Sequence, residues 1–307
     1  MKTIYIILII VFLYLSICNN CSNIKTNLVK EEFKSSKLKK YKLCIVAIFK
    51  NEQDYMEEWI DYHIAQGFDQ IFLYCNDPNL NKYPYLLNDK YKKFVTLIDW
   101  TNKENNGSNT VQRQAYKDCI KNYGNLCQFL LILDLDEFVH PYKQFNTVSD
   151  YIDSLIHDWS NIQSFKIQRY DFGSNGHKKK PNIPVTNAYT KHEKICSTYK
   201  AMANMDYVDT NDSFFGVHDF PYSNLDGKIY NDYLNYRETG YPSGCKQNSI
   251  NEIPLVINHY YTKSYDEYIK RCDLWKNGGI NPIGYRKNCE EEFKNRDVND
   301  SEDFKLI

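Results

Sequence analysis

The sequence lacks three short patterns, each of which would identify a common ligand. No glycine-rich turn of the G-x-G-x-x-G or Walker A type follows the first strand-like segment, which excludes a dinucleotide site or a P-loop there. The ten cysteines and seven histidines show no four-ligand zinc spacing. The formal net charge is -1, so no overall basic field favours a nucleic-acid partner. The chain is nevertheless long enough, at 307 residues, for one large core or two modest ones.

One apolar run near the N-terminus stops just short of a full membrane span. Residues 4–18, IYIILIIVFLYLSIC, are apolar apart from Ser16, whereas a spanning helix usually takes roughly 17–25 residues. No small-residue cleavage site follows, which favours an uncleaved signal anchor over a signal peptide. We therefore expect a single-pass membrane protein of the secretory pathway, Golgi-like, or of a viral membrane. Its orientation stays open, because the lysines cluster after the run and positive charge prefers the cytoplasm.

Composition divides the chain into three parts. Residues 1–18 form the signal anchor or signal peptide, and residues 19–41 are polar, lysine-rich and weakly periodic, as in a stem or linker. Residues 42–307 form one folded domain. The cysteines do not identify the compartment, and Cys44 and Cys75 lie in apolar runs typical of core thiols. Nothing in the pattern indicates the oligomeric state.

Strand-like runs alternate with helical patterns in the first half of this domain. The predicted strands cover residues 42–49, 70–77, 93–100 and 127–138. The predicted helices cover residues 51–67 and 110–124, each ending in glycine. This alternation predicts an α/β fold with a Rossmann-like, mostly parallel sheet and helices on both faces. The second half is less regular, with one further helix predicted around residues 264–279.

Polar residues follow each of the predicted strands, at the edge where ligands of parallel sheets bind. The clusters are Lys50-Asn51-Glu52, Asn76-Asp77, Asp99-Trp100 and Asp134-Leu135-Asp136-Glu137. We expect these clusters to converge on one site.

The stretch LLILDLDEFVHP, residues 130–141, permits two enzyme chemistries. It looks like the haloacid-dehalogenase signature, in which Asp134 would attack a phosphate and Asp136 would act as general acid. Phe138 stands where that motif carries Thr or Val, and three strand-like runs come first, which counts against a phosphatase. Alternatively, the carboxylates hold Mn²⁺ or Mg²⁺, and this ion offsets the negative charge of a nucleotide-sugar diphosphate. A catalytically inactive sugar-binding protein is a third possibility, against which the intact Asp134, Asp136 and His259 argue.

Five blocks of the sequence, in order, resemble one family. They are FKNEQDYMEEWIDYHIAQGFDQIFLY, QRQAYKDC with LILDLDEFVHP, FGSNGHKKKP, YKAMANMDYV with FFGVH, and INHYYTKSYDEYIKR. Together they are similar to glycosyltransferase family 92 and the related family 2-like group, over about residues 42–275. The resemblance implies a GT-A type catalytic domain with a DxD motif in residues 42–307. It also implies metal-dependent, inverting transfer of a hexose, galactose favoured, from a UDP-sugar to a glycan or protein-linked acceptor.

The resemblance assigns metal ligands as well. Asp136 would contact the metal directly, Asp134 would reach the metal or the ribose, and His259 would complete the metal site. Glu137 has two interpretations that stay open, as general base for an acceptor hydroxyl or as a carboxylate that orients its neighbours. His218 matches a family position, where acceptor binding and core hydrogen bonding are equally open.

The expected donor contacts come from four places in the chain, and each has a structural alternative. Asn51 and Glu52 lie where uracil and ribose would bind, or form an N-cap pair. Asp77 would hold the ribose hydroxyls, or stabilise a turn. Arg113 would reach a phosphate, or lie at the surface. Lys263 suits pairing with the diphosphate, although most lysines are simply solvated.

Overall fold

The computed structural model describes most of the folded domain. The described residues are 39–101, 103–106, 110–142, 144–194, 196, 198–211, 216–223, 227–230, 254–276 and 288–302. The predicted anchor, residues 1–18, and most of the predicted stem, residues 19–41, lie outside these ranges and stay predictions. Among the described helices, none is long and apolar enough to cross a membrane.

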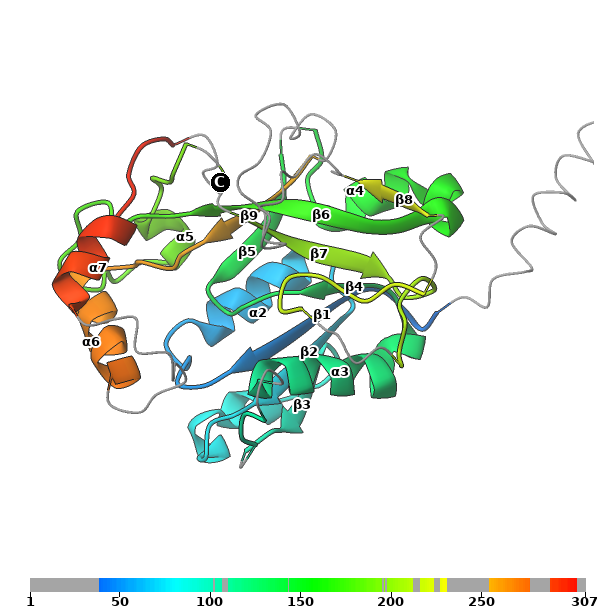
Figure 1. The fold of residues 1–307 in the computed structure, drawn as a ribbon, viewed down its shortest axis with the longest axis horizontal. Helices are drawn as coiled ribbons and strands as arrows, with labels where there is room; N and C mark the ends of the chain where they lie inside the picture. The colour runs from blue at the N-terminus through cyan, green and yellow to red at the C-terminus, as the bar shows by residue number, and fades with distance from the viewer. Residues whose placement is uncertain are drawn as a thin grey trace, which may run out of the picture. The chain divides into compact units, whose positions relative to one another are not determined.

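The described strands form one mixed sheet (Figure 1). The strands are β1 (Tyr41–Phe49), β2 (Gln70–Cys75), β3 (Val95–Asp99), β4 (Cys127–Ile132), β5 (Glu137–Pro141), β6 (Ile162–Asp171), β7 (Thr198–Asn204), β8 (Lys228–Tyr230) and β9 (Leu255–His259). Their order is β3-β2-β1-β4-β7-β6-β9-β5, and β8 also pairs with β6. The strands β1 to β4 run parallel to one another, as predicted. Beyond β4 the sheet becomes mixed, because β7 is antiparallel to both β4 and β6, whereas β9 is parallel to β6.

Helices cover both faces of the parallel half, as the alternating pattern predicts. The described α-helices are α2 (Met56–Ala65), α3 (Val111–Tyr123), α4 (Val148–Ser154), α5 (Val185–Ala188), α6 (Tyr265–Lys276) and α7 (Cys289–Arg296). Short 3-10 turns cover Leu80–Lys82, Pro84–Leu87, Gly124–Leu126 and Ile156–Asn161. Leu43 and Ile45 of β1 share a core with Trp59 of α2, whereas Val46 shares another with Tyr116 of α3. Successive side chains of a strand point to opposite faces, so α2 and α3 lie on opposite sides of the sheet.

The run predicted as one strand over residues 127–138 is two strands, and the single-strand prediction is wrong. β4 ends at Ile132, and the chain turns before β5 begins at Glu137, whose N–H donates to the Asp134 carbonyl (3.0 Å). β5 then pairs antiparallel with β9, which sets Glu137 opposite His259. The turn is hidden in the sequence because Leu135 within it is buried and extends the apolar pattern. This turn carries the Asp-x-Asp motif to the side of the late histidine.

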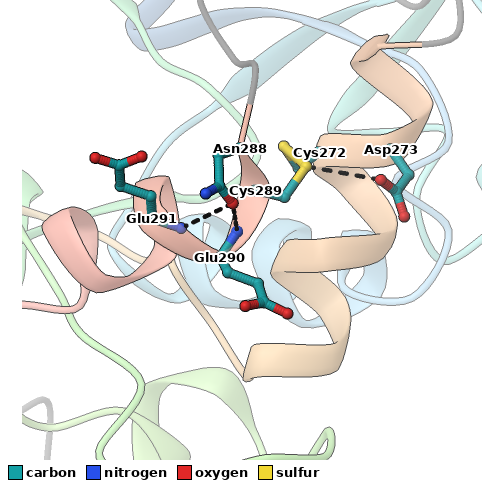
Figure 2. Close-up of a disulfide and its surroundings, with 6 residues drawn as sticks. All are labelled: Cys272, Asp273, Asn288, Cys289, Glu290 and Glu291. Carbon is teal, nitrogen blue, oxygen red and sulfur yellow. Dashed lines mark hydrogen bonds between the residues drawn. A yellow bond between two sulfur atoms is a disulfide. The ribbon is translucent and has the colours of Figure 1, made fainter.

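A disulfide joins the last two helices (Figure 2). Cys272 of α6 and Cys289 of α7 are bonded, with their Cα atoms 5.8 Å apart. The side chain of Asn288 caps α7 by accepting from the N–H of Glu290 (3.2 Å) and of Glu291 (3.3 Å). This helix pair matters for the site because α6 also carries Arg271.

Candidate active site

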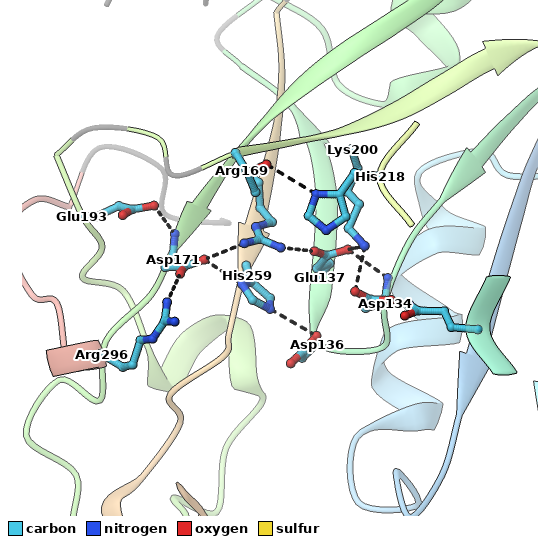
Figure 3. Close-up of polar contacts among 12 residues, drawn as sticks. Asp134, Asp136, Glu137, Arg169, Asp171, Glu193, Lys200, His218, His259 and Arg296 are labelled. Atoms are coloured by element: carbon cyan, nitrogen blue, oxygen red, sulfur yellow. Dashed lines mark hydrogen bonds and ion pairs between the residues drawn. The ribbon is translucent and has the colours of Figure 1, made fainter. Parts of the chain in front are cut away.

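Asp134, the first carboxylate of the motif, accepts hydrogen bonds from three side chains, although its own side chain is 32% exposed (Figure 3). The Lys200 ammonium donates to its Oδ2 (2.7 Å), and Gln112 Nε2 donates to its Oδ1 (3.1 Å). The Tyr116 hydroxyl donates to the same Oδ1 (3.3 Å). Burial alone would raise the pKa of Asp134, but the adjacent Lys200 ammonium keeps it below its usual value. The carboxylate is therefore ionised and paired with an internal cation.

Asp136, the second carboxylate, instead faces His259. Its Oδ1 lies 3.5 Å from His259 Nε2, and its Oδ2 lies 3.8 Å from Arg271 Nη1. Burial opposes ionisation here too, yet the neighbouring imidazole holds the pKa of Asp136 well below its usual range. The other ring nitrogen of His259, Nδ1, lies 2.6 Å from Asp171 Oδ1. Burial and Arg169 would lower the pKa of His259, but Asp136 and Asp171 outweigh them and raise it to about 9.

Glu137 is completely buried between Arg169 and Lys200 and is surrounded by donors. Its Oε1 accepts from Arg169 Nη1 (3.1 Å), while its Oε2 accepts from the Asp134 N–H (2.9 Å) and lies 3.3 Å from Lys200 Nζ. Burial raises the pKa of Glu137, although Lys200 and Arg169 oppose that shift. Arg169 reaches onward to Asp171 Oδ1 at 3.6 Å.

Asp77 has the contacts expected of the turn interpretation. It is fully buried, and its carboxylate accepts from the N–H groups of Asn51 (3.3 Å) and Asn79 (3.1 Å). Lys82 Nζ and the Tyr83 hydroxyl also donate to it, both at 3.1 Å. Burial would raise the pKa of Asp77, but these hydrogen bonds lower it. Asn51 has a positive φ of 60° in the loop after β1, and its N–H links that loop to Asp77 in the loop after β2. Contact of either residue with uracil or ribose stays a prediction.

Glu52 shares the electrostatic environment of the motif. Burial raises its pKa, Lys263 opposes the shift, and Asp136 adds to it, which places Glu52 at the same edge of the sheet. Arg113 lies on α3 directly after Gln112, the residue whose amide reaches Asp134. A phosphate contact for Arg113 stays a prediction.

Lys263 carries a buried cation without an anion beside it. The residue is 7% exposed and has a positive φ of 53°. Its Nζ lies 4.1 Å from the centre of the Tyr55 ring. Within the part of the chain that the structure describes, this ammonium has neither a hydrogen bond nor a carboxylate within 4.0 Å. Its charge lowers the pKa of Asp136, so it faces the motif.

The predicted metal ligands are Asp134, Asp136 and His259, and the structure brings two of them together. Asp136 and His259 offer an oxygen and a nitrogen, and Asp171 orients the imidazole as carboxylates commonly do for metal-bound histidines. Asp134 is turned toward Lys200. In the described ranges, no three His, Cys, Asp or Glu side chains gather into a ready-made metal site. Two protein ligands suit Mn²⁺ or Mg²⁺ when a diphosphate and water supply the remaining positions.

Lys200, Arg169 and Asp171 were not predicted from the sequence. Each lies in β6 or β7, strands that are almost wholly buried but whose sequences, IQSFKIQRYD and TYKAMAN, mix polar and apolar residues, so no local pattern marks these charged side chains. His218, shown beside them in Figure 3, has its pKa lowered to about 3 by burial and by Lys200 and Arg169. A neutral His218, with Nδ1 3.4 Å from Thr198 Oγ1, fits core hydrogen bonding, and acceptor binding stays a prediction.

The fold and these residues define an α/β domain with a carboxylate turn at the carboxyl ends of its parallel strands. The family model of Glycosyltransferase family 92 matches residues 39–296, and the chain belongs to this family.

Curated relatives agree with that assignment. A family 92 protein of Ricinus communis is 22% identical over 175 residues, covering 56% of this chain and 30% of that protein. A family 92 protein of Oryza sativa subsp. japonica is 24% identical over 228 residues, covering 72% and 33% respectively. The beta-1,4-galactosyltransferase galt-1 of Caenorhabditis elegans is 28% identical over 127 residues, covering 39% and 29%. The alignments thus span about a third of each relative.

One solved structure shows a slight likeness. The mannosyltransferase PcManGT from Pyrobaculum calidifontis, in complex with GDP-Man and Mn²⁺, aligns with a TM-score of 0.31 and 11% identity. The alignment covers 43% of this chain and 36% of that one, which is too little to support an inference.

Proposed function

We propose that this chain is a metal-dependent, inverting glycosyltransferase that moves a hexose from a UDP-sugar to a glycan or protein-linked acceptor. Family membership supports glycosyl transfer over phosphatase chemistry, and the name of the Caenorhabditis elegans relative supports galactose. The observation at the site that carries the proposal is the Lys263 ammonium, which is buried, has no carboxylate within 4.0 Å in the described chain, and acts through its charge on Asp136. A diphosphate supplies the anion that such a cation needs.

The residues of the site divide the work of binding the donor. Asp136 and His259 would hold the divalent ion, with Asp171 fixing the imidazole. When bound, that ion supplies positive charge to the departing nucleoside diphosphate. Lys263 would donate to the same diphosphate, and its place over Tyr55 keeps the ammonium in position before the donor arrives.

The test is donor turnover by the purified protein and two carboxylate variants. Release of the nucleoside diphosphate is measured, UDP from UDP-galactose and UDP-glucose and GDP from GDP-mannose, with Mn²⁺ present. Asp136→Asn should lower turnover by at least about a hundredfold, because the amide would no longer hold the divalent ion that offsets the charge of the departing diphosphate. The matched control, Asp89→Asn, changes a carboxylate that is 91% exposed and should leave turnover unchanged.

A binding experiment separates the metal site from the chemistry. Mn²⁺ binding without donor, followed by electron paramagnetic resonance, should weaken roughly tenfold or more in His259→Gln. His157→Gln, at an exposed position, is its control. Undiminished turnover of Asp136→Asn, or full turnover in excess EDTA, would contradict the metal-dependent mechanism.

A further inference from the structure

Acidic and basic side chains alternate along a path that runs from one aspartate of the motif to the other. In order, the path runs through Asp134, Lys200, Glu137, Arg169, Asp171, His259 and Asp136 (Figure 3). The successive nitrogen–oxygen distances are 2.7, 3.3, 3.1, 3.6, 2.6 and 3.5 Å. The path closes because only Leu135 separates its two ends in the sequence. We call these seven residues the charge ring.

Burial makes the alternation necessary. Lys200 and Glu137 have no exposed side-chain surface, and the Arg169 side chain is 13% exposed. A charge withdrawn from water is stable only beside opposite charges and hydrogen-bond partners. Removing Lys200, Glu137, Arg169, Asp171 or His259 therefore leaves two neighbours of like charge without the group between them.

Glu137 is poorly placed to act on an acceptor hydroxyl. A general base must come within hydrogen-bonding reach of the proton that it takes. Both oxygens of Glu137 already accept from ring members or from the Asp134 N–H, and the side chain has no exposed surface. Its surroundings are those of a group that holds other groups in place.

We propose that Lys200 and Glu137 are positioning residues of the active site, and that Glu137 is not the catalytic base. Lys200 fixes Asp134 from the β7 side. Glu137 fixes Arg169, which reaches Asp171, and Asp171 aims His259 at Asp136. The built-in Lys200 ammonium offsets the repulsion of the carboxylates, so the motif keeps its shape before the ion and the donor bind. The kinetic part of this inference rests on the proposed glycosyltransferase function.

A double-mutant cycle distinguishes positioning from base catalysis. Its variants are Lys200→Met, Glu137→Gln and the combination of both. Lys200→Met leaves the Asp134 and Glu137 carboxylates without the ammonium between them, and Glu137→Gln leaves Lys200 and Arg169 without the carboxylate between them. The combination removes both partners of one ion pair. We expect kcat of the double variant to exceed that of Glu137→Gln by roughly tenfold, as for strongly coupled neighbours. If Glu137 were the catalytic base, the double variant would lack the base as well and its kcat would not recover. A kcat of the double variant no higher than that of Glu137→Gln would therefore contradict the proposal.

A control cycle uses an exposed ion pair that is not part of the charge ring. Lys90 and Asp61 lie 2.8 Å apart and are both about half exposed, so Lys90→Met and Asp61→Asn should combine additively. Coupling as large in this pair as in the ring would show that the rescue is not specific, and would overturn the proposal.

Urea unfolding of the same variants keeps the test decisive if a single variant is too unstable to assay. The double variant should unfold at a higher urea concentration than the less stable single variant. If the double variant unfolds at a lower urea concentration than either single variant, the proposed coupling within the charge ring is contradicted. Urea unfolding needs no substrate. If the wild type turned over no nucleotide sugar, the proposed function would be contradicted, but the unfolding measurements would still test the coupling between Lys200 and Glu137.

Discussion

A single cation, Lys263, gives the sharpest test of donor binding at the scale of one residue. Its ammonium is buried over Tyr55 and has no anionic partner in the described residues. Lys263→Gln should raise the KM for the nucleotide sugar by roughly tenfold or more, the usual loss for a hydrogen bond to a charged group. The kcat should change much less, because the ammonium binds the diphosphate in both the ground state and the transition state.

Lys93→Gln is the matched control for this variant. Lys93 also lies over an aromatic ring, that of Phe94 at 5.2 Å, but its side chain is exposed and distant in sequence from the motif. Initial rates over a range of donor concentrations measure both variants. An unchanged donor KM in Lys263→Gln would remove this residue from the diphosphate site.

His63 provides a test of stability against pH that is independent of the active site. It is fully buried on α2, its Nδ1–H donates to the Trp59 carbonyl (2.8 Å), and Nε2 accepts from the Val139 N–H (3.4 Å). Burial lowers its pKa to about 3. The unfolded chain, with a histidine pKa near ~6.5, takes up this proton first, so the stabilisation is complete above ~6.5 and is lost as pH falls toward 3.

The expected size follows from that shift. Between pH 7.5 and 5.5 the wild type should lose about 1.4 kcal/mol more unfolding free energy than His63→Gln, which has no proton to gain. Urea unfolding of both proteins at the two pH values measures the difference, and the shared contributions of other groups cancel. Equal losses in the two proteins would mean that His63 is not buried in its neutral form.

At the scale of elements, the first half of the domain could be predicted because its patterns are local. The spacing of apolar residues gives β1, β2, β3, α2 and α3 to within a few residues, and Gly67, with φ of 87°, ends α2 as expected. The spacing of apolar residues predicts a strand or helix where that spacing is regular. It does not predict the turn between β4 and β5, because buried Leu135 continues the apolar run through the turn.

The candidate site also contains residues that local sequence predicts and residues that it does not. The motif and His259 could be found from short blocks of sequence, and the structure pairs Asp136 with His259 across the β5–β9 ladder. Lys200 lies 66 residues from Asp134, and it reaches the carboxylate only because β7 pairs antiparallel with β4. Such a contact depends on sheet order, which no local pattern specifies. Two aspartates so close together do not by themselves require a metal ion, since Lys200 already offsets part of their charge.

At the scale of the whole molecule, two features give opposite answers for the side of the membrane that the domain faces. Seven lysines lie between residue 19 and residue 42, against one before the apolar run, which favours a cytoplasmic domain if residues 4–18 span the membrane. The Cys272–Cys289 disulfide favours the opposite side, because such bonds form and persist in oxidising compartments. Charge bias is a statistical preference, whereas a structural disulfide requires an oxidant. We therefore propose that the domain faces the lumen or the cell exterior.

Protease protection and thiol labelling of the full chain expressed in animal cells test this orientation. In sealed microsomes the domain should resist added protease until detergent opens the vesicles. After denaturation, Cys272 and Cys289 should react with a polyethylene glycol maleimide only once a reductant has been added. The Cys272→Ser/Cys289→Ser double variant is the control, and it should lose two of the mass shifts that depend on reduction. Digestion of the domain in sealed vesicles, with both thiols reactive before reduction, would instead place it in the cytoplasm and make the lysine-rich segment the better guide.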